Sequence, residues 1–115
     1  MSRLTIYGIK SCDTCRKAIK WLDEHEHSYR WHDLRADGIE GHQVRRWLTA
    51  LGTDLLINRR STTWRSLSEA ERARAGDPDQ AVALLVSNPT LIKRPVFERD
   101  DRVMVGFDAA VRESL

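Results

Sequence analysis

The sequence predicts an α/β fold in which a mixed β-sheet is interrupted by an inserted helical segment. Three observations predict it: residues 1–35 have a strand–helix–strand pattern, residues 36–88 carry helical signals, and residues 89–115 contain two β-rich runs and a short helix. A chain of 115 residues has room for one compact domain with one hydrophobic core. We therefore expect a single domain over residues 1–115, with the helical segment packed on one sheet.

The beginning of the chain predicts a βαβ unit. Residues 3–7 are β-prone and predict the first strand, and the aromatic–polar alternation of residues 28–34 predicts the second. Between them we expect a helix from about residue 13 to residue 26, with Ser11 as its N-cap. Its apolar residues recur at helical spacing: Cys15, Ala18, Ile19 and Leu22. Two strands joined by one helix favour parallel pairing.

The middle of the chain predicts a series of short helices. A helix over about residues 42–51 has one apolar stripe and ends at Gly52, a residue type favoured just after a helix. Residues 53–64 predict a short helical turn followed by a basic loop. Either Ser66 or Ser68 suits the start of the next helix, because each is followed by a glutamate three positions later.

The last elements have clear boundary signals. Asp77, which is followed by a proline, predicts the start of a helix that Pro89 ends. Two β-rich runs then flank Asp100 and Asp101, and this pattern predicts a hairpin with its turn at these two residues. A final short helix is expected over residues 108–113.

Composition limits the classes of function. The chain has 19 basic and 17 acidic residues, a net charge of +2, and this balance argues against general nucleic-acid binding. No apolar run approaches the roughly 20 residues of a membrane span, and the N-terminus lacks the pattern of an export signal. We therefore expect a cytoplasmic protein, in whose reducing surroundings the two cysteines are catalytic, metal-binding or inert.

The two cysteines, Cys12 and Cys15, lie at the predicted junction between the first strand and the first helix. Unpaired backbone N–H groups and the helix dipole favour a thiolate at Cys12. Three basic residues lie close in sequence: Lys10, Arg16 and Lys17. Cys15 falls on the apolar stripe, so it is either a packed side chain or a second reactive thiol.

Two structural roles for the cysteines are disfavoured. A disulfide between them would close a very small loop and remove little conformational entropy from the unfolded chain. A zinc site needs about four ligands, whereas the chain offers one Cys-x-x-Cys pair with three further candidates: His25, His27 and His32. Histidines so close together at a helix end are more typical of solvated surface residues. We therefore expect no metal.

A thiolate that handles an anion also needs fixed positive charge nearby. The candidates are Arg59, Arg60, Lys93 and Arg94. Arg94 is the best placed, because the proline that follows it keeps residue 94 out of the α region and so defines the backbone there. For Arg59, a solvated surface charge is the favoured interpretation.

Five segments together carry a resemblance to a known family: TIYGIKSCDTCRKAIKWL, YRWHDLRADGI, RRSTTWRSL, NPTLIKRPVF and VMVGF. In this order they resemble the ArsC/Spx family of thioredoxin-like proteins, and in particular its YffB-like ArsC-related reductases. The resemblance covers nearly the whole chain. It implies a thioredoxin-like fold, with a βαβ part at residues 1–35, a ββα part at residues 89–115 and an inserted helical segment at residues 36–88.

The resemblance also implies roles for individual residues. The family's catalytic cysteine matches Cys12, and its arginine before proline, which helps to hold the oxyanion in arsenate reductases, matches Arg94. Its mid-chain arginine matches Arg59 or Arg60, and the sequence RRSTTW favours Arg60. Arsenate reductases carry a third arginine after the hairpin, where this chain has Gly106. The implied substrate-anion site comprises Lys10, Ser11, Asp13, Thr14, Arg60, Arg94 and Pro95.

The expected function is that of a cytoplasmic thiol-dependent oxidoreductase, in which Cys12 attacks an oxyanion or a glutathione-linked substrate. Glutathione is the expected co-substrate, glutaredoxin a further partner, and Cys15 a candidate resolving thiol. We expect a monomer without a bound cofactor that contacts neither nucleic acid directly nor a membrane. The alternative is an Spx-like redox-sensing regulator that binds RNA polymerase through a Cys12–Cys15 switch, and a thiol-inert adaptor is a third hypothesis.

Overall fold

The computed structural model describes residues 3–115, which form two compact units. One unit combines the described residues up to Asp37 with Arg94–Leu115, and the other is Gly38–Lys93. The first contains the sheet and both cysteines, and the second contains short helices. The predicted inserted segment, 36–88, stops before residues 89–93, which belong to the helical unit. The single-domain organisation stays a prediction.

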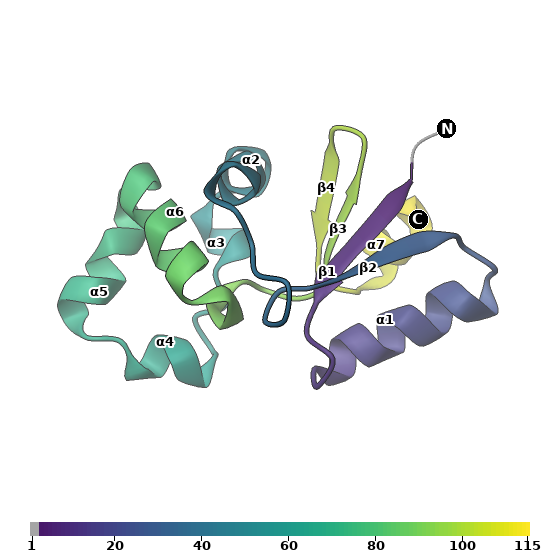
Figure 1. The fold of residues 1–115 in the computed structure, drawn as a ribbon, viewed down its shortest axis with the longest axis horizontal. Coiled ribbons are helices and arrows are strands. Elements are labelled where there is room, and N and C mark those ends of the chain that lie inside the picture. The colour runs from purple at the N-terminus through teal and green to yellow at the C-terminus, as the bar shows by residue number, and fades with distance from the viewer. Residues whose placement is uncertain (1–2) are drawn as a thin grey trace. The chain divides into compact units, whose positions relative to one another are not determined.

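A mixed β-sheet is the centre of the first unit (Figure 1). Within residues 3–115 it has four strands, in the order β2-β1-β3-β4. Their bounds are Leu4–Gly8 for β1, Tyr29–Asp33 for β2, Val96–Arg99 for β3 and Arg102–Val105 for β4. β1 pairs with β2 in parallel, whereas β3 pairs antiparallel with both β1 and β4. The predicted α/β fold with a βαβ part and a ββα part is therefore confirmed.

Helix α1 (Asp13–Glu24) joins β1 to β2, and helix α7 (Ala109–Ser114) follows β4. Both helices contribute to one buried cluster, which also contains residues of β1 and β3: Leu4, Ile6, Ala18, Leu22, Phe97 and Val111. Ile6 lies opposite Phe97 in the β1–β3 register, so the two side chains share the face that the helices cover. Burial of this face fixes the register of the sheet.

The prediction that Ser11 caps α1 is wrong. The N-cap is Cys12, whose backbone is extended, with φ −82° and ψ 121°. The Cys12 N–H donates to the carbonyl of Ile9 at 3.0 Å. This hydrogen bond closes a tight turn over residues 9–12, so the helix begins only after Cys12. The helix also ends at Glu24 rather than at Glu26, because Glu26 has a φ of 56°, outside the helical region.

The helical unit begins with α2 (Gly41–Leu51), and Gly52 follows it with a φ of 82°. Its further helices are α3 (Thr53–Leu56), α4 (Thr62–Ser66), α5 (Glu69–Ala73), η1 (Arg74–Gly76), α6 (Pro78–Ser87) and η2 (Pro89–Leu91). α2 and α6 pack together, and fully buried Trp47 is the largest side chain of this core. Among the described residues, 3–115, no helix is long and apolar enough to cross a membrane.

The caps of the helical unit decide between the sequence alternatives. Ser68, not Ser66, begins α5: its hydroxyl accepts the Glu71 N–H at 3.1 Å, and the Glu71 carboxylate accepts the Ser68 N–H at 3.0 Å. Asp77 caps α6 as predicted. The predicted basic loop is shorter than expected, because Ser61 accepts the Trp64 N–H at 3.1 Å and starts α4.

Candidate active site around Cys12

Cys12 lies where β1 passes into α1, as the sequence predicts, and it is half-buried. Its carbonyl accepts the Arg16 N–H at 3.0 Å and so begins the first helical turn. The Arg16 side chain turns back, and its Nε–H donates to the carbonyl of Lys10 at 3.0 Å. The loop before Cys12 is therefore tied to the first turn of the helix that follows it.

The surroundings of Cys12 favour its thiolate. Burial by itself would raise the pKa of the Cys12 thiol, but the backbone amide of Cys15 and the side chain of Arg94 hydrogen-bond to the sulfur. The Cys15 thiol and the positive charge of Arg94 act in the same direction, so the net pKa of Cys12 lies below its ordinary value. Because the amide belongs to the first turn of α1, the helix N-terminus contributes to this stabilisation.

Cys15 is electrostatically the opposite of Cys12. Its side chain is fully buried. The pKa of the Cys15 thiol is raised to about 12, chiefly by burial and also by the neighbouring Cys12, although a backbone hydrogen bond from Ile9 and the charge of Arg94 act in the opposite direction. At neutral pH, Cys15 is therefore a protonated thiol that donates toward the Cys12 sulfur.

The position of the Cys15 sulfur depends on Gly8. A Cβ atom added to Gly8 would overlap Cys15 Sγ and would lie 3.0 Å from Cη2 of Trp31. The last residue of β1 thus leaves the space that the Cys15 sulfur fills, and a glycine is needed there because of this close approach. The absence of a side chain at Gly8 therefore determines where the Cys15 thiol lies beside Cys12.

Arg94 comes to Cys12 from the far end of the chain, as the sequence predicts. It precedes Pro95, and the Arg94-Pro95 peptide bond is cis. The carbonyl of Pro95 accepts the N–H of Gly106 at 2.9 Å, which ties this turn to the end of β4. Gly106 has a φ of 84°, a conformation that an arginine at this position would rarely adopt.

The other predicted site residues of the first unit lie around the start of α1. Lys10 and Ser11 are exposed and line a hollow of about 450 Å³. Asp13 and Thr14 are exposed in the first helical turn, and the Asp13 carboxylate lies 3.7 Å from Arg16. Its negative charge would repel an anion, so the backbone amides of this turn suit an anion better than the Asp13 side chain does. Pro95 is buried.

Arg59 and Arg60 belong to the helical unit. The Arg59 guanidinium donates to the Asp54 carboxylate at 3.2 Å and lies over the Trp64 ring at 5.4 Å. These contacts give Arg59 a local structural role, in keeping with its interpretation as a surface charge. Arg60 is exposed, and its role toward Cys12 stays a prediction.

Asp33 is a residue of this region that we did not single out from the sequence. It is the last residue of β2, 6% exposed, and its Oδ1 accepts the N–H groups of Arg35 at 2.8 Å and Ala36 at 2.9 Å. Burial opposes ionisation, but these amides, the Lys10 amide and the Lys10 charge outweigh it and lower the pKa of Asp33. The signal in the sequence is an aspartate directly before a loop, where Asx turns are common.

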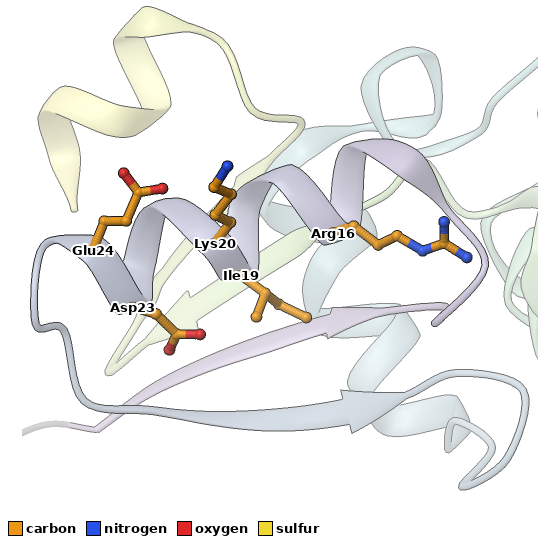
Figure 2. Close-up of a pocket in the computed structure, with 5 residues that line it drawn as sticks. All are labelled: Arg16, Ile19, Lys20, Asp23 and Glu24. Atoms are coloured by element: carbon orange, nitrogen blue, oxygen red, sulfur yellow. The ribbon is translucent and has the colours of Figure 1, made fainter.

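Two other features of the described residues, 3–115, bear on the choice of site: their possible metal ligands and their further hollows. Among residues 3–115, no group of three or more His, Cys, Asp or Glu side chains is placed to hold a metal ion. His25 and His27 instead stack on Trp21, with ring centroids at 4.1 and 5.3 Å. A hollow of about 590 Å³ lies along α1, but Figure 2 shows that the side chains lining it point in different directions.

The electrostatics of Cys12 lead to a testable prediction. The rate of alkylation by iodoacetamide should reach half its maximum at a pH below the ordinary cysteine pKa of 9.0, because the thiolate is the reacting species. Arg94→Ala should shift this midpoint upward, and Arg94→Lys should shift it less, because lysine keeps the charge. Arg102→Ala is the matched control on β4. Identical midpoints for Arg94→Ala and wild type would contradict the assignment of Arg94.

Comparison with known proteins identifies the family of the chain. The model of the ArsC family matches residues 7–114. A solved YffB protein is 42% identical over 96% of both chains, with a TM-score of 0.89. An arsenate reductase (ArsC) related protein from Brucella melitensis is 41% identical over 97% of this chain and 92% of its own, with a TM-score of 0.76.

A regulator is also among the relatives. The global transcriptional regulator Spx of Listeria innocua is 31% identical over 112 aligned residues, which cover 91% of this chain and 80% of the regulator. The similar proteins thus include one named as related to arsenate reductase and one named as a regulator of transcription. The fold, the Cys12 site and the family match lead to one conclusion: the chain belongs to the ArsC family.

Proposed function

We propose that the protein is a glutathione-dependent thiol oxidoreductase of the ArsC-related type, with Cys12 as its nucleophile. The observation that carries the proposal is the contrast between the two cysteines. The pKa of Cys12 is lowered by the Cys15 amide and by Arg94 in spite of partial burial, whereas burial raises the pKa of Cys15 to about 12. One thiolate beside a helix N-terminus and an arginine suits attack on an electrophile that carries negative charge.

With a glutathione-linked substrate, the reaction balances as two thiol–disulfide exchanges. The Cys12 thiolate attacks the glutathione sulfur of the mixed disulfide; a new S–S bond forms, the old one breaks, and the substrate leaves as a thiolate that takes a proton from water. A second glutathione, as its thiolate, then attacks the glutathione sulfur on Cys12. Oxidised glutathione leaves, and the Cys12 thiolate is regenerated.

An oxyanion substrate would use the same groups. Its reduction takes two electrons from two thiols, which leave joined as a disulfide, while one oxygen of the oxyanion leaves as water. Arg94 and the first-turn amides of α1 would stabilise the negative charge that develops, and we assign the same role to Arg60. This chemistry needs a supply of reduced thiol, so we place the protein in the cytoplasm, with glutaredoxin as an additional reductant. We also propose that it acts as a monomer.

An intact-mass measurement tests the proposal. After mild oxidation in the presence of glutathione, we expect a mass gain of one glutathione that is lost in the Cys12→Ser variant. The reason is that the Cys12 thiolate reacts from the accessible side, while Cys15 stays a buried thiol. A loss of two hydrogens, with no glutathione added, would contradict an externally resolved nucleophile.

The second candidate function is that of an Spx-like regulator. The Cys-x-x-Cys pair and the likeness to the Listeria innocua regulator favour it. In that case a reversible Cys12–Cys15 disulfide would control binding to RNA polymerase, and small thiols would be turned over slowly or not at all. The same mass measurement separates the two functions, because the regulator needs an internal Cys12–Cys15 disulfide and the externally resolved oxidoreductase does not.

A further inference from the structure

The hollow lined by Lys10 and Ser11, hereafter the cleft, takes no part in the thiol–disulfide exchanges proposed above, although the family resemblance implies both residues for the substrate-anion site. It has a volume of about 450 Å³ and two walls: Ile9, Lys10 and Ser11 from the loop before α1, and Asp33, Arg35 and Ala36 from the end of β2 and the loop after it. Cys12 is the next residue after Ser11, so the cleft adjoins the nucleophile along the chain. The cleft is shallow and open to solvent, so it suits one small polar group of a ligand rather than an enclosed molecule.

The buried carboxylate of Asp33 holds the two walls together. Its Oδ1 accepts the N–H groups of Arg35 and Ala36 in one wall at 2.8 and 2.9 Å. The Lys10 backbone amide, in the other wall, also hydrogen-bonds to this carboxylate. In addition, the Leu34 N–H donates to the Gly8 carbonyl at 2.8 Å and continues the β1–β2 pairing up to the cleft. The cleft is therefore pre-formed by the bonds of the Asp33 carboxylate to backbone amides and by the pairing of β1 with β2.

The charge of the cleft favours an anionic group. The negative charge of Asp33 faces backbone amides of both walls, and its side chain is only 6% exposed. The two remaining charged side chains that line the cleft, Lys10 and Arg35, are cationic and exposed. An arginine presents N–H donors in a planar fork that matches a carboxylate. A ligand with a carboxylate therefore complements the cleft.

We propose that this cleft binds a carboxylate of the thiol that resolves the Cys12 adduct, with Arg35 and Lys10 as the cationic groups. The proposal rests on the proposed function, since it names the class of the second substrate: a thiol that carries a free carboxylate. The incoming thiolate forms a disulfide with the sulfur attached to Cys12, and the Cys12 thiolate leaves. Arg35 takes no part in this exchange of bonds, so its contribution is to binding.

The test compares two thiols in wild type and in Arg35→Ala. For glutathione, we expect the KM of Arg35→Ala to rise about tenfold with little change in kcat, because one charge-assisted contact is lost. For 2-mercaptoethanol, an uncharged thiol without a carboxylate, both constants should stay as in wild type. Arg35→Lys should restore part of the affinity for glutathione. Arg30→Ala, which removes an exposed arginine of β2 outside the cleft, is the matched control.

Each other outcome decides a different question. Equal KM values of Arg35→Ala and wild type for glutathione would overturn the cleft proposal and leave the proposed function standing. A similar loss with both thiols would also overturn it, because a site for a carboxylate cannot act on 2-mercaptoethanol. If wild type turned over neither thiol, the proposed function would fail and the cleft proposal with it. Alkylation of Cys12 by neutral iodoacetamide should be the same in Arg35→Ala and wild type.

Discussion

Replacement of Cys12 by serine is expected to abolish glutathione-coupled thiol transfer, with a rate reduction of about 10³-fold or more. Serine is almost the same size as cysteine, so the turn at the start of α1 should persist. Its hydroxyl, however, is not ionised at neutral pH and forms no disulfide. The measurement is the rate of oxidised glutathione formation from a small mixed disulfide.

Cys15→Ser is the matched control for this experiment. The Cys15 group that contributes most to lowering the pKa of Cys12 is its backbone amide, which the substitution keeps. The serine hydroxyl can also replace the thiol as a hydrogen-bond donor. We expect turnover within a few-fold of wild type. A Cys12→Ser variant with substantial activity, or a Cys15→Ser variant as inactive as Cys12→Ser, would contradict a single nucleophile resolved from outside.

Gly8→Ala is expected to destabilise the protein by about 1–3 kcal/mol, as overpacking of a tightly filled interior does. The added Cβ would overlap Cys15 Sγ and press on the Trp31 ring. Cys15 cannot swing away freely, because its side chain is fully buried. The measurement is the free energy of unfolding from denaturant titration, together with the pH midpoint of Cys12 alkylation.

A double variant and a second glycine make this prediction specific. Cys15→Ala removes the sulfur that the new Cβ would meet, so Gly8→Ala with Cys15→Ala should lose less stability than the two single variants together. Gly76 has no heavy atom within 4 Å of an added Cβ, and Gly76→Ala should leave stability nearly unchanged. A Gly8→Ala variant as stable as Gly76→Ala would show that this contact can relax without penalty.

The position of Cys12 could be predicted from the sequence because it follows from local signals. A β-prone run, a glycine and an apolar stripe at helical spacing place it at a strand–helix junction, and the structure confirms this. The exact cap was wrong by one residue, because the turn that connects Cys12 to Ile9 is a matter of backbone geometry rather than of side-chain type. Arg94 was found because Pro95 marks it.

What the sequence could not predict depends on contacts between distant segments. Asp33 is buried beside the Cys12 loop because β1 and β2 pair from Leu4–Tyr29 to Gly8–Asp33, and such a register is not visible in residue types. The raised pKa of Cys15 requires full burial against Gly8, which an apolar stripe only suggests. In the helical unit, the isolated bridge between Ile57 and Ile92 joins segments that sequence patterns treat separately.

The pairing of β1 with β3 has a consequence for the order of folding. It brings together Tyr7 and Glu98, which are 91 positions apart in the chain and share a hydrogen bond of 3.1 Å. The closure of so long a loop is entropically unfavourable and slow, whereas β2 and α1 lie near β1 in sequence. Arg94 lies two residues before the start of β3, so it reaches Cys12 only after this closure. Until its C-terminal strands have joined the sheet, a newly synthesised chain therefore lacks the contribution of Arg94 to the lowered pKa of Cys12, and the site is completed last.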